Sequence, residues 1–114
     1  MTDLFLHNPR CSKSREALAL VRDAGLELPV REYLREALSV EELRRIVTML
    51  GVRPIDVVRR KEKEFAELGL GDDTPDEEVL RAMAQHPILI ERPIVVRGER
   101  AVIGRPVENV RDLL

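Results

Sequence analysis

The 114-residue chain has few aromatic residues, one cysteine and two histidines. Phe, Trp and Tyr together make up 3% of it, so the core must consist mainly of Leu, Val, Ile and Ala. A single cysteine excludes a disulfide within the chain and indicates a reducing, cytoplasmic location. One cysteine and two histidines are also too few ligands for a structural zinc site, so we expect no bound metal.

Long apolar segments and a strong charge of one sign are missing as well. No apolar run approaches the about 20 residues that cross a bilayer, and the first ten residues lack the pattern of a signal peptide. The net charge of −2 gives no reason to expect a nucleic acid or a membrane as partner. With 44% hydrophobic and 35% charged residues, we expect one globular domain over residues 1–114, and nothing requires more than a monomer.

The first third of the chain has the pattern of strand, helix and strand. Residues 3–7 contain the short apolar run of a buried strand. A helical pattern of apolar residues begins just after Cys11 and stops at Gly25, and a second strand is expected over residues 29–33. A strand–helix–strand unit of this size implies that the two strands are parallel neighbours.

The middle of the chain, about residues 39–87, is predicted to be helical. Ser39 and Glu42 have the spacing of a capping box, in which each side chain binds a free backbone amide at the helix start. Thr74 is the expected N-cap of a later helix, which should end before Pro87.

The last third has the pattern of a β-hairpin followed by a helix. The apolar segments 94–96 and 101–103 should pair through a tight turn at Gly98. The final helix should carry its apolar face on three residues: Val107, Val110 and Leu114. The sequence therefore predicts an α/β fold, with a four-stranded mixed sheet and a helical insertion between a β-α-β half and a β-β-α half.

The only cysteine lies in the cationic stretch HNPRCSKSR, residues 7–15, at the start of the first predicted helix. Free backbone amides and the helix dipole place partial positive charge there. Three basic residues add to this charge: Arg10, Lys13 and Arg15. We also expect the hydroxyls of Ser12 and Ser14 to donate hydrogen bonds to the sulfur. Such surroundings lower a cysteine pKa from about 8.5 to about 3.5–7.5, so Cys11 is predicted to be a reactive thiolate rather than a buried apolar residue.

Several common cysteine chemistries do not fit this stretch. A phosphatase loop of the Cys-x5-Arg kind would need arginine at position 17, which is Ala17. A dithiol motif would need a second cysteine at position 14, which is Ser14. A Cys-His protease would depend on His7 or His86 as the base, which is weak support. Cys11 is therefore expected to act as a monothiol that depends on an external thiol.

The chain resembles the glutaredoxin-coupled arsenate reductases in four segments. The family pattern His-Asn-Pro-x-Cys-x-x-Ser-Arg is matched within residues 7–15, and the later segments are VVRRKEKEFAELGL, HPILIERPIVV and IGRP. The resemblance covers nearly the whole chain and implies a thioredoxin-like fold with a helical insertion. It also implies Cys11 as the nucleophile and His7 as the residue that assists it, with Ser14 and Arg15 supporting the thiolate.

The same resemblance implies three arginines that bind an oxyanion or its transition state: Arg59, Arg92 and Arg105. The tandem pair leaves Arg60 as an alternative to Arg59, which the family pattern favours. Arsenate is a tetrahedral oxyanion, and a guanidinium group offers paired donors to two of its oxygens. Arg92 and Arg105 each precede a proline, which holds the backbone extended. Pro93 also matches the cis-proline of thioredoxin-like folds.

The activity implied by this resemblance is the reduction of arsenate, with glutathione as co-substrate, glutaredoxin as partner and no bound cofactor. Two alternatives remain open from the sequence. One is a monothiol oxidoreductase of the same fold that acts on another substrate, such as glutathionylated proteins. The other is a regulator of the Spx type that binds RNA polymerase, although such proteins commonly have a Cys-x-x-Cys pair, which Ser14 interrupts here.

Overall fold

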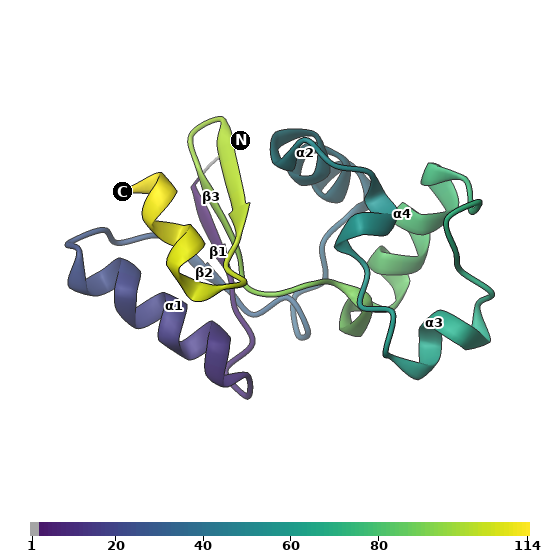
Figure 1. Ribbon diagram of the computed structural model, residues 1–114, viewed down its shortest axis with the longest axis horizontal. Coiled ribbons are helices and arrows are strands. Elements are labelled where there is room, and N and C mark those ends of the chain that lie inside the picture. The colour runs from purple at the N-terminus through teal and green to yellow at the C-terminus, as the bar shows by residue number, and fades with distance from the viewer. Residues whose placement is uncertain (1–2) are drawn as a thin grey trace. The chain divides into compact units, whose positions relative to one another are not determined.

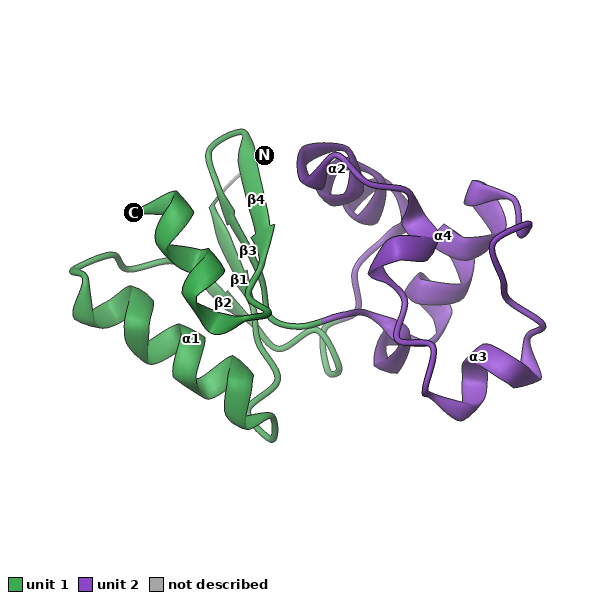
Figure 2. Ribbon diagram, in the orientation of Figure 1, with its two compact units in different colours: residues 1–36, 92–114 green, residues 37–91 purple. Residues whose placement is uncertain are grey.

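The computed structural model describes residues 3–114, which form two compact units (Figures 1 and 2). The sheet unit comprises both ends of the chain, up to residue 36 and from residue 92 onward. The helical unit comprises residues 37–91 and contains the insertion expected over about residues 39–87. The description of residues 1–114 as one domain stays a prediction.

A four-stranded mixed sheet with the order β2-β1-β3-β4 forms the sheet unit. The central strand β1 (Leu4–Leu6) runs parallel to β2 (Val30–Arg31) and antiparallel to β3 (Ile94–Arg97). The edge strand β4 (Arg100–Ile103) pairs antiparallel with β3. The predicted mixed α/β sheet, including the parallel β-α-β pair, is confirmed.

Helix α1 (Ser12–Asp23) and the 3₁₀ helix η3 (Val107–Leu113) cover one face of this sheet (Figure 1). Their apolar side chains pack against side chains of β1 and β3. The buried residues of this core are Phe5, Ala17, Val21, Val95, Val107, Val110 and Leu113. Aliphatic residues dominate it, and burial of their apolar surface supplies the main driving force for folding of the unit.

The final helix is a 3₁₀ helix, whereas its predicted apolar face assumed an α-helix. Leu113 is buried, whereas Leu114 is 48% exposed, so the expectation that Leu114 packs on the apolar face is wrong. A 3₁₀ helix has three residues per turn, so Val107, Val110 and Leu113 follow one another on one side. The predicted face assumed the α-helical period of 3.6 residues.

The hairpin between β3 and β4 turns through two residues, as its apolar pattern predicted. Gly98 has a φ of 63°, and Glu99 keeps a negative φ. A positive φ at the first central residue alone is typical of a type II′ turn, in which glycine is strongly preferred. The Gly98 amide also donates to Asp3 Oδ1 at 2.7 Å, which connects the turn to the residue before β1.

Five short helices make up the helical unit: α2 (Val40–Leu50), η1 (Pro54–Val57), α3 (Lys63–Glu67), α4 (Asp76–Gln85) and η2 (Pro87–Leu89). The predicted capping box starts α2. The Glu42 amide donates to Ser39 Oγ at 3.1 Å, and the Ser39 amide donates to Glu42 Oε1 at 3.0 Å. Helix α4 ends before Pro87, as expected.

Two details of the helical unit differ from the predictions. The N-cap of α4 is Pro75 rather than Thr74, because Thr74 Oγ1 accepts a hydrogen bond from the Gly71 amide at 2.9 Å. Three acidic residues complement the dipole in the first turn of α4: Asp76, Glu77 and Glu78. Helix α3 was not predicted, because its sequence lies in a charged run whose alternating signs resemble a solvated surface.

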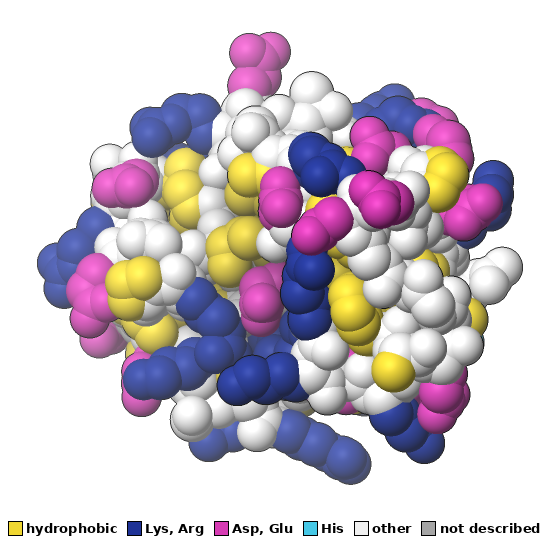
Figure 3. All heavy atoms as spheres, turned by 45° about the vertical axis from the view of Figure 1, so that its right-hand side comes forward, with side chains coloured by type: hydrophobic (Ala, Val, Ile, Leu, Met, Phe, Trp, Pro, Cys, Tyr) yellow, Lys and Arg dark blue, Asp and Glu magenta, His cyan; other side chains and the backbone are white. Residues whose placement is uncertain are grey.

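Basic and acidic side chains are interspersed over the face of the molecule shown in Figure 3. This mixture agrees with the formal net charge of −2. Among residues 3–114, no helix combines the length and the apolar character that would cross a membrane.

Candidate active site

A tight turn positions Cys11 at the N-cap of α1. The Cys11 amide donates to the Asn8 carbonyl at 3.0 Å, and the Arg10 amide donates to Asn8 Oδ1 at 3.0 Å. The Arg15 side chain reaches back from α1 and donates to the Pro9 carbonyl at 2.7 Å. Asn8 therefore builds the turn, a role that the sequence analysis missed although asparagine is a typical turn residue.

Cys11 is partly buried, and its surroundings favour the thiolate. Burial alone would raise the thiol pKa, but the Ser14 backbone amide and the positive charge of Arg92 outweigh it. The Lys13 amide and the charge of Arg105 act in the same direction, so the net pKa of Cys11 is lowered. The lowered pKa and the part played by backbone amides at the start of α1 agree with the prediction, but the charges that act on the sulfur are those of Arg92 and Arg105 rather than the predicted local ones.

The prediction that the Ser14 hydroxyl donates a hydrogen bond to the sulfur is wrong, because this hydroxyl contacts His7 instead. The Ser14 side chain is fully buried, and its Oγ lies 2.7 Å from His7 Nδ1. The same oxygen accepts a hydrogen bond from the Asn8 amide at 3.1 Å. Ser14 therefore acts on the sulfur through its backbone, while its hydroxyl connects α1 to the segment that follows β1.

His7 is held as a buried, neutral imidazole. Burial lowers its pKa, and the charges of Arg22 and Arg15 lower it further against the opposing effect of Glu32. The His7 amide donates to the Arg31 carbonyl at 2.9 Å, and the ring meets Phe5 edge-on with centroids 5.7 Å apart. The contact of its Nδ1 with Ser14 connects His7 directly to α1, the helix whose N-cap is Cys11.

Two of the three predicted arginines gather at Cys11. Arg105 Nη2 lies 3.5 Å from Cys11 Sγ, and Arg105 Nε donates to the Arg92 carbonyl at 2.7 Å. The Arg92–Pro93 peptide bond is cis, in agreement with the family pattern. The Arg105–Pro106 bond is also cis, which the sequence analysis did not predict.

Gly104 allows the two Arg-Pro segments to approach each other. A Cβ atom at this position would lie 2.8 Å from Pro93 Cγ and 3.2 Å from Val110 Cγ1, so any side chain would clash. The Gly104 amide donates to the Pro93 carbonyl at 2.9 Å. The sequence analysis missed this role, for which glycine next to the second Arg-Pro pair was the available signal.

Arg59 and Arg60 lie in the helical unit, and each has an acidic partner there. Arg59 Nη1 is 2.8 Å from Glu62 Oε1, and these two side chains are 23% and 24% exposed. Arg60 donates to Asp72 at 2.6 Å and also lies over the ring of Phe65. The role of Arg59 at the thiol site stays a prediction.

The other histidine has a structural position. His86 lies between α4 and η2, where its carbonyl accepts a hydrogen bond from the Leu89 amide at 2.9 Å. Within residues 3–114, no three His, Cys, Asp or Glu side chains are grouped closely enough to hold a metal ion.

The fold and the site together define an α/β protein of thioredoxin-like type with a single activated thiol at the start of its first helix. The model of the ArsC family matches residues 6–113, which is nearly the whole chain. The protein belongs to the ArsC family.

Relatives of known name agree with this assignment. An arsenate reductase of Rhizobium meliloti (strain 1021) is 46% identical over 100% of this chain and 82% of its own length. An arsenate reductase of Haemophilus influenzae is 40% identical over the full length of both chains. A solved structure, the arsenate reductase from Vibrio cholerae, has 45% identity and a TM-score of 0.94 over 100% of this chain and 98% of its own.

Proposed function

We propose that this protein is an arsenate reductase that uses Cys11 as its nucleophile and glutathione as its co-substrate. The observation that carries the proposal is the Cys11 sulfur, whose pKa is lowered and which lies 3.5 Å from the Arg105 guanidinium. The Rhizobium and Haemophilus relatives are named arsenate reductases, which supports the choice of arsenate over other oxyanions.

The first step is attack of the Cys11 thiolate on arsenic. A sulfur–arsenic bond forms, and one arsenate oxygen leaves as water after protonation. Glutathione then attacks the sulfur of Cys11, so the sulfur–arsenic bond breaks and its electron pair stays on arsenic. Arsenic is reduced from As(V) to As(III), while the two thiols are oxidised to one mixed disulfide. The sum is arsenate plus two thiols giving arsenite, one disulfide and water, which balances.

The arginines neutralise the oxyanion and the charge that develops on it. Arg105 is already at the sulfur, and Arg92 is connected to it through its carbonyl. Both can therefore meet the oxygens of an arsenate whose arsenic approaches Cys11. Arg59 would be the third arginine to bind the arsenate oxygens. To bind Arg59, the arsenate has to compete with Glu62 for the same guanidinium group.

His7 and the external thiols complete the cycle. The neutral imidazole of His7, held through Ser14, can accept a proton during thiol activation or return one to the leaving oxygen. The chain has no second cysteine, so glutaredoxin would release Cys11 from its mixed disulfide with glutathione. We further propose a monomeric, cytoplasmic enzyme without a bound cofactor.

The test is arsenite formation from arsenate in the presence of glutathione and glutaredoxin. Wild type should form arsenite, and Cys11→Ser should not. Arg59→Ala should lower turnover, while the matched neighbour Arg60→Ala should not, because the family pattern favours Arg59 as the oxyanion ligand and both arginines already have an acidic partner. Absence of arsenite with wild type would refute the substrate. If wild type instead reduced glutathionylated proteins, the alternative monothiol activity would replace the proposal.

A further inference from the structure

A pocket of about 430 Å³ lies on the His7 side of the turn that carries Cys11. Residues 7–10 form one wall, and the segment after β2 forms the other with Glu32, Leu34 and Arg35. All of these residues belong to the sheet unit. The volume is within the range of about 300–1,000 Å³ that small-ligand sites occupy.

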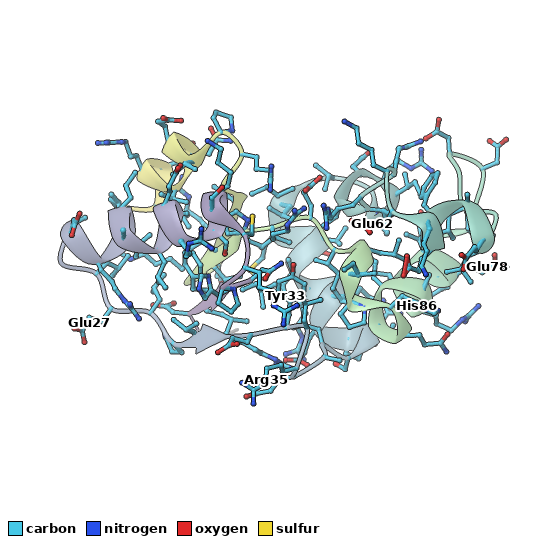
Figure 4. The ribbon with its side chains drawn as sticks, turned by 90° about the horizontal axis from the view of Figure 1, so that it is seen from below. Glu27, Tyr33, Arg35, Glu62, Glu78 and His86 are labelled. Atoms are coloured by element: carbon cyan, nitrogen blue, oxygen red, sulfur yellow. The ribbon has the colours of Figure 1, made fainter. Side chains whose placement is uncertain are left out.

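The pocket is lined by more basic than acidic side chains. Its lining contains two arginines, Arg10 and Arg35, one glutamate, Glu32, and the apolar residues Pro9 and Leu34. The Arg35 side chain is 81% exposed, and its ion pair with Glu32 is 4.0 Å long. Figure 4 shows Arg35 extending away from the ribbon. A pair this long and exposed is worth little, so a ligand can displace it.

This arrangement does not suit a small oxyanion. Arsenate has no apolar surface for Pro9 and Leu34, and the carboxylate of Glu32 would repel it. A better match is a short peptide with two carboxylates and one ammonium group. These are the charged groups of glutathione at neutral pH, so two guanidinium groups and one carboxylate complement them one for one.

We infer that this pocket binds the peptide body of glutathione, with Arg10 and Arg35 on its carboxylates and Glu32 on its ammonium group. The inference rests on the proposed function, in which glutathione reacts at Cys11. Arg10 is adjacent to Cys11 in the chain, so their Cα atoms are about 3.8 Å apart. A tripeptide extends over about 10 Å, which allows its ends to occupy the pocket while its central thiol reaches the sulfur.

Binding can be measured without any turnover. S-methylglutathione keeps the charged groups of glutathione but has no free thiol, and it is titrated into the full chain while backbone amide shifts are followed by NMR. We expect saturable shifts at Asn8, Arg10, Leu34 and Arg35. Shifts confined to a second hollow of about 310 Å³, lined by Lys13, Arg105 and Glu108, would overturn the inference.

Variants test the assigned charges. Arg10→Ala and Arg35→Ala should each raise the Kd for S-methylglutathione about 2- to 5-fold, as expected for a solvent-exposed ion pair. Arg35→Lys keeps the charge and should restore most of the affinity. Arg111→Ala is the matched control, since Arg111 is an exposed arginine on η3 outside the pocket. An unchanged Kd in both Arg10→Ala and Arg35→Ala would refute the inference.

The two proposals fail in different ways. Arsenite formation by wild type together with an unchanged Kd in the pocket variants would refute the pocket and leave the arsenate activity standing. Localised, arginine-dependent binding of S-methylglutathione without arsenite formation would support the pocket and refute arsenate as the substrate.

Discussion

Ser14→Ala should cost stability without changing the acidity of Cys11. The hydroxyl of Ser14 is buried and bonded to His7 Nδ1 and to the Asn8 amide. What favours the thiolate is the Ser14 backbone amide, which alanine retains. The substitution therefore separates the structural role of the Ser14 hydroxyl from the electrostatic role of its backbone amide.

The loss can be estimated from the groups left behind. Alanine removes the partner of the buried His7 Nδ1 and of the part-buried Asn8 amide. Each buried polar group left without a partner costs about 1–3 kcal/mol. The two together give an expected loss of about 2–6 kcal/mol in the free energy of unfolding, which is a large share of the about 5–15 kcal/mol typical of small proteins.

Urea unfolding measures the loss in stability, and the pH dependence of iodoacetamide alkylation measures the thiol pKa. Ser12→Ala is the matched control for the stability measurement, because Ser12 is exposed at the first position of the same helix. Ser14→Ala should lower the urea midpoint strongly and keep the alkylation midpoint of wild type. A raised thiol pKa with unchanged stability would show that the hydroxyl acts on the sulfur, and would refute this account.

Two further predictions concern Arg105 and His7. Arg105→Ala should raise the pKa of Cys11 and slow its alkylation at neutral pH about 2- to 5-fold, because a solvent-exposed charge pair is worth about 0.5–1 kcal/mol. An unchanged alkylation rate would show that Arg105 does not stabilise the thiolate. The pKa of His7 is lowered from 6.5 in the folded state, so the unfolded chain takes up a proton at a higher pH than the folded chain does. The free energy of unfolding should therefore fall as the pH drops below 6.5. His7→Gln should flatten that part of the urea-unfolding profile against pH; an equally steep loss in the variant would assign it to other groups.

Local patterns were sufficient to predict most of the elements. The capping box at Ser39, the hairpin turn at Gly98 and the parallel pairing of β1 with β2 depend on neighbouring residues or on general connection rules. The position of Cys11 at a helix start is local as well, because the turn before it is built by Asn8 within the same stretch.

The details that failed depend on partners that a local pattern does not specify. Thr74 could cap the next helix or bind the Gly71 amide, and the structure selects the latter. Ser14 could face the sulfur or His7, and the buried imidazole takes the hydroxyl. The period of the last helix depends on its packing against the sheet, so the sequence did not distinguish a face ending at Leu113 from one ending at Leu114.

The activation of Cys11 depends on contact between the two ends of the chain. Arg105 is 94 residues away in the sequence, and its guanidinium donates both to the sulfur and to the Arg92 carbonyl. The planar guanidinium group of an arginine can donate to two acceptors at once, whereas the ammonium group of a lysine is a single point charge. The Ser14 amide, Arg92 and Arg105 surround the sulfur only in the folded state, so the pKa of the Cys11 thiol is lower there than in the unfolded chain. Ionisation of Cys11 therefore adds to the stability of the fold as the pH rises through the folded-state pKa, so the groups that make the thiolate reactive also contribute to stability in that pH range.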